Sequence, residues 1–150
     1  MKRISYFTRT GSLFIGALLF AGIGICSCDK LDENGKLDGN WQLLEWKVKS
    51  TNEVVATNET SKIFYTIKLD LIKMQNMESD KLPYYHSTFH YTKDSLFIDR
   101  VYQRPLDNEV PCDSLVTFGG TPSGKYAIET LTNSKMVLSN ELNTLSFRKY

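Results

Sequence analysis

Cysteine is scarce in this sequence, and its placement excludes a disulfide framework for the folded part. The 150 residues contain three cysteines, of which Cys26 and Cys28 lie near the N-terminus and only Cys112 follows. A single thiol cannot form an internal disulfide, so the fold must be held together by packing alone. A metal or redox pair at Cys26 and Cys28 would need a second cluster of ligands, which the sequence lacks.

Runs of basic residues are also missing. Residues 1–27 hold three of the 18 lysines and arginines and none of the 17 acidic residues. The remainder therefore has 15 basic against 17 acidic residues, a formal charge of −2. Nucleic-acid binding depends on clustered positive charge, so nucleic acid is excluded as an expected partner.

Only one long hydrophobic run is present, Leu13–Ile23, and three basic residues precede it. It is shorter than the about 20 residues that span a membrane and matches the apolar region of an export signal. The segment Ile25-Cys26-Ser27-Cys28 that follows resembles a lipobox, in which a small residue stands before the lipidated cysteine. We predict that residues 1–27 are a cleaved signal and that Cys28 carries the lipid anchor.

Residues 28–36 are polar and short, which predicts a solvated tether between the anchor and the folded domain. Lys30 followed by acidic residues resembles the surface-export signal of Bacteroidetes lipoproteins, although Leu31 interrupts that pattern. The expected location is the bacterial outer membrane, either on its periplasmic face or on the cell surface. The membrane is thus the one partner that the sequence predicts.

Helical periodicity is absent from the rest of the chain, where apolar residues alternate with polar ones. Ile63, Tyr65 and Ile67 share one face of a strand. The apolar parity changes near Leu71-Ile72, which indicates a bulge or bend in a long strand. Further strands are predicted at residues 41–48, 84–91, 95–102, 114–118, 125–130, 135–139 and 144–149.

This pattern predicts one all-β domain over residues 37–150, because the segments are short and turn residues separate them. Sequential hairpins favour an up-and-down antiparallel β-barrel of about eight strands, since closure removes exposed strand edges. A β-sandwich has the same periodicity and remains the alternative.

Two segments resemble the ends of a lipocalin barrel. Gly39-Asn40-Trp41 resembles the Gly-x-Trp opening of lipocalins, and Arg148 stands where lipocalins carry an arginine that packs across that tryptophan. The order of Ile63–Thr66 and Phe118-Gly119 is similar to that in small lipocalin-like (calycin-type) lipoproteins of Bacteroidetes. The resemblance implies that Gly39, Trp41 and Arg148 close one end of the barrel. It also implies an interior that holds a small hydrophobic or amphipathic ligand.

Four aromatic residues are the candidates to line such a ligand site: Tyr84, Tyr85, Phe89 and Tyr91. Aromatic residues on strands also serve core and cross-strand packing, which is the alternative interpretation.

The sequence offers no catalytic constellation. His86 and His90 stand four residues apart, about 13 Å on a strand, too far to share one metal ion. Cys112 has no activating base beside it in the sequence, and the carboxylates form no acid–base pair. We therefore expect no enzyme activity, no metal and no cofactor.

Two functions remain open. The first is an outer-membrane lipoprotein whose barrel binds a small apolar ligand. The second is a packed barrel whose loops, around residues 105–111 and 119–124, bind a protein partner or an inhibitor target in the cell envelope.

Overall fold

The computed structural model describes residues 33–78 and 84–150, so the predicted signal, Cys28 and most of the tether lie outside the described residues. The strands are β1 (Gly39–Val48), β2 (Val54–Thr57), β3 (Ile63–Lys68), β4 (Leu71–Asn76), β5 (Tyr84–Tyr91), β6 (Ser95–Arg104), β7 (Asn108–Val110), β8 (Lys125–Leu131), β9 (Lys135–Ser139) and β10 (Asn143–Lys149). Two short 3₁₀ helices accompany them, η1 (Gly35–Leu37) and η2 (Cys112–Phe118). The described residues form no helix long and apolar enough to cross a membrane.

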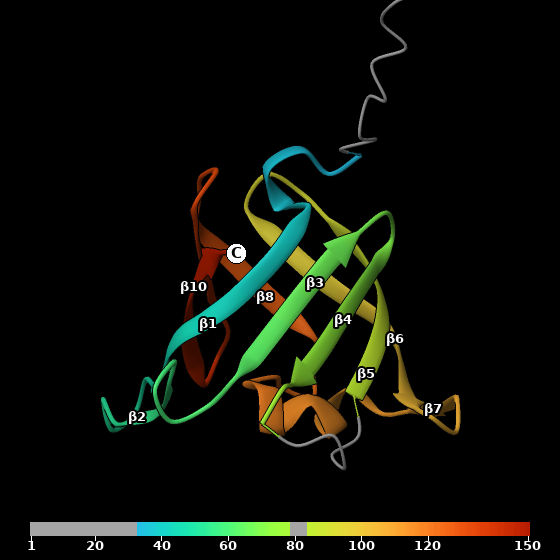
Figure 1. The fold of residues 1–150 in the computed structure, drawn as a ribbon, viewed down its shortest axis with the longest axis horizontal. Coiled ribbons are helices and arrows are strands. Elements are labelled where there is room, and N and C mark those ends of the chain that lie inside the picture. The colour runs from blue at the N-terminus through green and yellow to red at the C-terminus, as the bar shows by residue number, and fades with distance from the viewer. Residues whose placement is uncertain (1–32, 79–83) are drawn as a thin grey trace, which may run out of the picture. The chain divides into compact units, whose positions relative to one another are not determined.

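Eight of the strands close into a ring of hydrogen-bonded neighbours. The order around the ring is β1-β3-β4-β5-β6-β8-β9-β10, and β10 pairs with β1. Short strands β2 and β7 add to the ring at β1 and β6 (Figure 1). The predicted up-and-down barrel is confirmed, and a two-sheet sandwich is excluded because the first and last strands pair.

The predicted long strand through Leu71-Ile72 is wrong. The chain instead makes a tight hairpin between β3 and β4, in which Ile67 pairs with Ile72. Leu69 lies in the turn with a positive φ of 57°. The inward-facing residues have odd numbers in β3 and even numbers in β4, because Ile67 pairs with Ile72. The change from odd to even apolar positions in the sequence therefore marked a reversal of the chain.

The predicted strand Ser114–Phe118 is also wrong, because this segment belongs to η2. Leu115 and Phe118 are buried three residues apart, which is the repeat of a 3₁₀ helix. Pro111 stands before the helix, and Gly119 ends it in the left-handed conformation with φ 82°. A proline before and a glycine after an apolar stretch are helix boundary signals, and they were present in the sequence.

Large side chains fill the ring. Trp41, Tyr65, Tyr126 and Phe147 are the largest of the fully buried residues. The side chains with no accessible surface at all are Leu37, Trp41, Leu43, Ile72, Met74, Ser87, Met136, Leu138, Leu145 and Phe147. A side chain that no water molecule can touch borders no cavity large enough to hold one. The barrel around these residues is therefore packed solid.

The two short helices lie at opposite ends of the ring (Figure 1). At one end η1 buries Leu37, whose carbonyl accepts a hydrogen bond from Trp41 Nε1 at 2.8 Å. We call this the tether end, because the chain enters the barrel here. At the other end, the η2 end, Leu115 and Phe118 point into the core.

Side chains from two strands and a turn hold η2 in place. The Tyr65 hydroxyl donates to the Phe118 carbonyl at 2.5 Å. The side-chain amides of Asn140 and Asn143 donate to the Gly119 carbonyl at 2.9 and 3.2 Å. The carbonyls at the end of the helix thus have partners inside the protein, as buried polar groups require.

Tyr65 and Tyr126 allow a direct measurement of what this contact contributes. Both are 1% exposed, and burial raises the pKa of each hydroxyl above its usual value. Among the described residues, however, the Tyr126 hydroxyl has no hydrogen-bond partner. We expect Tyr65→Phe to lower the free energy of unfolding by about 1–2 kcal/mol, because the buried Phe118 carbonyl loses its donor. Tyr126→Phe should leave it unchanged or raise it.

Urea unfolding of the two variants checks this expectation, since each removes one oxygen from a buried ring. Equal losses of stability in both would contradict the assignment of the hydrogen bond to Tyr65.

Candidate functional site

The four aromatic candidates do not form one pocket. Tyr85 and Phe89 point into the packed core, where the Tyr85 ring meets Phe118 edge-on with centroids 5.7 Å apart. Tyr84 lies on the outer face of β5, and Tyr91 is partly exposed at the end of the strand. The strand alternation therefore divides the set between core and surface, as the packing interpretation of these residues implies.

The two histidines have separate surroundings. His90 Nδ1 lies 2.8 Å from Asp99 Oδ1, and its ring stacks on Phe97. His86 instead meets Tyr84 edge-on. Within residues 33–78 and 84–150, no group of three or more histidine, cysteine or carboxylate side chains is arranged to hold a metal ion.

Cys112 is half-buried at the start of η2. Burial raises the pKa of its thiol, and the negative charges of Asp113 and Asp99 raise it further. These surroundings favour the neutral thiol over the nucleophilic thiolate.

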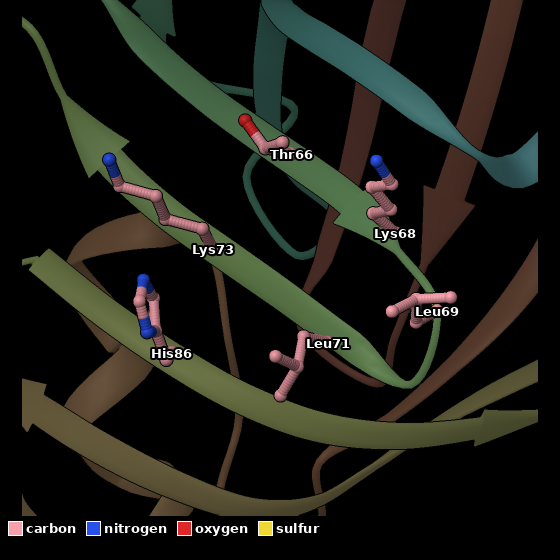
Figure 2. A pocket seen from close by; sticks show the side chains of 6 residues that line it. All are labelled: Thr66, Lys68, Leu69, Leu71, Lys73 and His86. Atoms are coloured by element: carbon pink, nitrogen blue, oxygen red, sulfur yellow. The ribbon is translucent and has the colours of Figure 1, made fainter. Parts of the chain in front are cut away.

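A groove of about 200 Å³ lies on the outer wall of the barrel, across β3, β4 and β5. Its lining residues are Thr66, Lys68, Leu69, Leu71, Lys73 and His86. Figure 2 shows Lys73 and His86 toward one side of the groove and Lys68 with Leu69 toward the other. Because these residues point outward, the groove is separate from the barrel interior. Sequence reasoning missed it, since it exists only once β3 and β4 pair.

The groove combines apolar surface with positive charge. Leu69 and Leu71 are 42% and 43% exposed. Among the described residues, no carboxylate lies within ion-pair distance of Lys68 or Lys73, and the Lys73 ammonium sits 4.8 Å from the centre of the Tyr84 ring. Burial, then the charges of Arg104 and Lys73, lower the pKa of His86, so this imidazole is neutral at pH 7.

The tether end of the barrel is closed by a lysine rather than by the predicted arginine. In the β1–β10 register, Trp41 lies opposite Lys149, and Gln42 lies opposite Arg148. The Lys149 ammonium lies 5.2 Å from the Trp41 ring centre. Arg148 points to the outer face, where its Nε and Nη2 donate to Gln42 Oε1 at 3.0 and 2.8 Å. Arg148 and Trp41 are thus on opposite faces, which corrects the predicted contact between them.

Gly39 fits this closure for a steric reason. Its φ of 132° belongs to a region that side chains disfavour. A Cβ built at Gly39 would overlap the Lys149 side chain at Cε. The ammonium of Lys149 also donates to the Lys36 carbonyl at 3.2 Å. Glycine therefore leaves room for the Lys149 side chain at the point where the chain enters the barrel.

Comparisons with known proteins agree with this fold. A family described as a lipocalin-like domain matches residues 23–150. The chain belongs to this lipocalin-like family. A search of the curated proteins gave no match.

Two solved structures resemble the lipocalin-like domain. A lipocalin-like protein from Bacteroides uniformis has a TM-score of 0.57 and 22% identity, covering 77% of this chain and all 100% of the other. An uncharacterised protein from Bacteroides eggerthii has a TM-score of 0.51 and 21% identity, covering 75% of this chain and 98% of the other. At such identities the likeness shows a shared fold.

Closure of the lipocalin-like barrel by Gly39 and Lys149 predicts a coupled pair of substitutions. Gly39→Ala should lower the free energy of unfolding by about 1–3 kcal/mol, because the backbone is strained there and the flexible Lys149 side chain must move off Trp41 to make room for the Cβ. Lys149→Ala removes the side chain that the new Cβ would meet. The double variant should therefore lose about 1 kcal/mol less stability than the sum of the two single losses.

Gly35→Ala is the matched control. Gly35 also has a positive φ, but nothing lies within 4 Å of the position that a Cβ would take there. It should therefore show backbone strain without coupling to Lys149. Strict additivity of Gly39→Ala and Lys149→Ala in urea unfolding would refute the steric account.

Proposed function

We propose that this chain is a lipid-anchored, non-catalytic recognition module of the bacterial cell envelope, which binds a protein partner through the loops at the η2 end of a packed barrel. The anchor rests on the lipobox-like segment before Cys28 and would hold the protein at the outer membrane. The proposal for the barrel rests on one observation above all, the 0% exposure of ten residues in its core.

A transport lipocalin needs an interior that a ligand can enter. Here Trp41, Met74, Met136 and Phe147, from four different strands, have no accessible surface. An apolar ligand site of ordinary size has a volume of about 300–1,000 Å³. Space of that size around these residues would leave parts of them accessible, so the packing favours function at the surface.

The η2 end carries apolar side chains that the fold does not bury. Leu106 is 74% exposed in the turn between β6 and β7, and Val116 is exposed on η2. Leu142, in the turn between β9 and β10, and Met77, after β4, are exposed at the same end. Exposed apolar groups gathered on loops of a rigid scaffold are typical of protein-binding surfaces.

Hydrogen bonds fix the β9–β10 turn and the segment that follows η2, which favours recognition over mere flexibility. Asn140 joins the β9–β10 turn to Gly119. The Lys49 ammonium donates to the Asn140 carbonyl at 2.6 Å, and the Ser123 hydroxyl donates to Glu141 at 3.0 Å. A loop that is already ordered loses less conformational entropy on binding a partner.

Carriage of a small ligand is the second candidate, and one observation favours it. Ser87 Oγ and the Tyr126 hydroxyl are buried inside the ring, and neither has a hydrogen-bond partner in the described part of the chain. Buried hydroxyls normally have partners, so these two are where the polar group of an occupant would bind.

The test is site-specific photo-crosslinking in living cells. A photoreactive amino acid at Leu106 or Val116 should capture the same protein, and Leu106→Asp should abolish capture from position 116. Ala127, exposed on the barrel wall in β8, is the matched control and should capture none. Equal capture at Ala127, or none at any position, would reject the η2 end as the binding surface. A lipophilic molecule recovered in one-to-one ratio from the purified protein would instead support the second candidate.

A further inference from the structure

The wall groove and the tether end belong to the same part of the barrel. The hairpin between β3 and β4, with Leu69 at its tip, shares this end with η1 (Figure 1). The Asn34 side-chain amide donates to the Leu69 carbonyl and to Asp38 Oδ1, both at 2.6 Å. The incoming chain is therefore tied directly to the hairpin that forms one rim of the groove.

The length of the tether limits how far this end can be from the lipid anchor. Cys28 precedes Asn34 by six residues, which span at most about 20 Å even when fully extended. That distance is smaller than the thickness of one bilayer. An anchored chain would thus hold the tether end, and not the η2 end, close to the membrane surface.

The surface chemistry of the tether end fits a lipid surface. Leu69 and Leu71 are exposed there, as are Tyr91 and the C-terminal Tyr150. Apolar side chains, tyrosines and lysines together are typical of segments that lie in the interface between lipid and water. The lysines at or beside this end are Lys36, Lys68, Lys73, Lys93, Lys135 and Lys149.

Carboxylates lie at this end as well: Asp70 and Asp94 in its turns, Glu33 before η1, and Asp29 and Asp32 in the predicted tether. Asp38 is buried and accepts hydrogen bonds from Asn34. Lys68 and Lys73 flank the exposed leucines and have no ion-pair partner among the described residues. Lys68, beside Leu69 at the end of β3, is placed to bind anionic headgroups where the leucines enter the interface, whereas the Lys73 ammonium must move away from the Tyr84 ring to reach them.

We propose that the tether end docks on a membrane surface with anionic headgroups, with Leu69 and Leu71 entering the interface and Lys68 and Lys73 binding lipid phosphates. The orientation rests on the lipid anchor of the proposed function. The docked barrel then holds η2 and its exposed loops away from the membrane. The anchor therefore fixes the direction of the barrel as well as its location.

The experiment uses the lipidated chain in vesicles that contain anionic phospholipid. In a Cys112→Ser background, an environment-sensitive fluorophore is placed at Leu71→Cys or, as the matched control, at Leu106→Cys at the η2 end. A quencher attached to the lipid chains should quench the probe at residue 71 and leave the probe at residue 106 bright. Lys68→Glu with Lys73→Glu, or high salt, should abolish most of the quenching at residue 71 while the protein stays bound through its anchor.

The outcomes separate the two proposals. A chain that does not associate with vesicles at all, and carries no lipid by mass spectrometry, overturns the anchor and the orientation with it. A chain that is bound but equally quenched at residues 71 and 106 overturns the docking alone. If the probe at residue 71 is shielded from water but is not quenched by the lipid-attached quencher, a protein covers the groove. That result would also overturn the docking. The charge-reversal pair Lys47→Glu with Lys62→Glu, near the far ends of β1 and β3 from the tether end, should leave quenching unchanged.

Discussion

The pairing of β1 with β10 is the interaction on which the rest of the structure depends. It closes the ring. It also pairs the first strand of the domain with the last over seven residue pairs, from Trp41–Lys149 to Val48–Asn143. Without it, two strand edges would be open and the inward face would be exposed along one side. At the end of this seam Gly39 leaves room for the Lys149 side chain, which gives this glycine a steric explanation.

Closure has a consequence for function, because the ring is small and its inward positions carry large residues. Aromatic, leucine and methionine side chains meet across the interior, and η1 and η2 cover the two ends. The packing that stabilises this barrel without disulfides is the same packing that leaves a ligand little space. In the proposed function, recognition takes place on the outer surface: at the loops of the η2 end, and at the groove and lysines of the tether end.

The sequence predicted the parts of the fold that depend on strand alternation. The strands at residues 84–91 and 135–139 have the bounds expected from alternation, because each has one buried and one outer face. The errors arise where spacing is ambiguous. Residues 114–118 have the length of a short strand, but Leu115 and Phe118 have the spacing of a 3₁₀ helix, and Tyr65 from a distant strand fixes its end. Arg148 and Lys149 are adjacent cations, and only the register with Trp41 shows which one faces inward. The wall groove depends on three strands side by side, which no local pattern encodes.

The central claim is that the lipocalin-like barrel is packed and works through its surface. Crystals of the mature chain under xenon pressure test it most directly, because xenon enters apolar cavities that water leaves empty. The account predicts no xenon site inside the ring between Trp41, Met74 and Met136. An ordered xenon atom among these side chains would contradict it and return the function to carriage of a small apolar ligand.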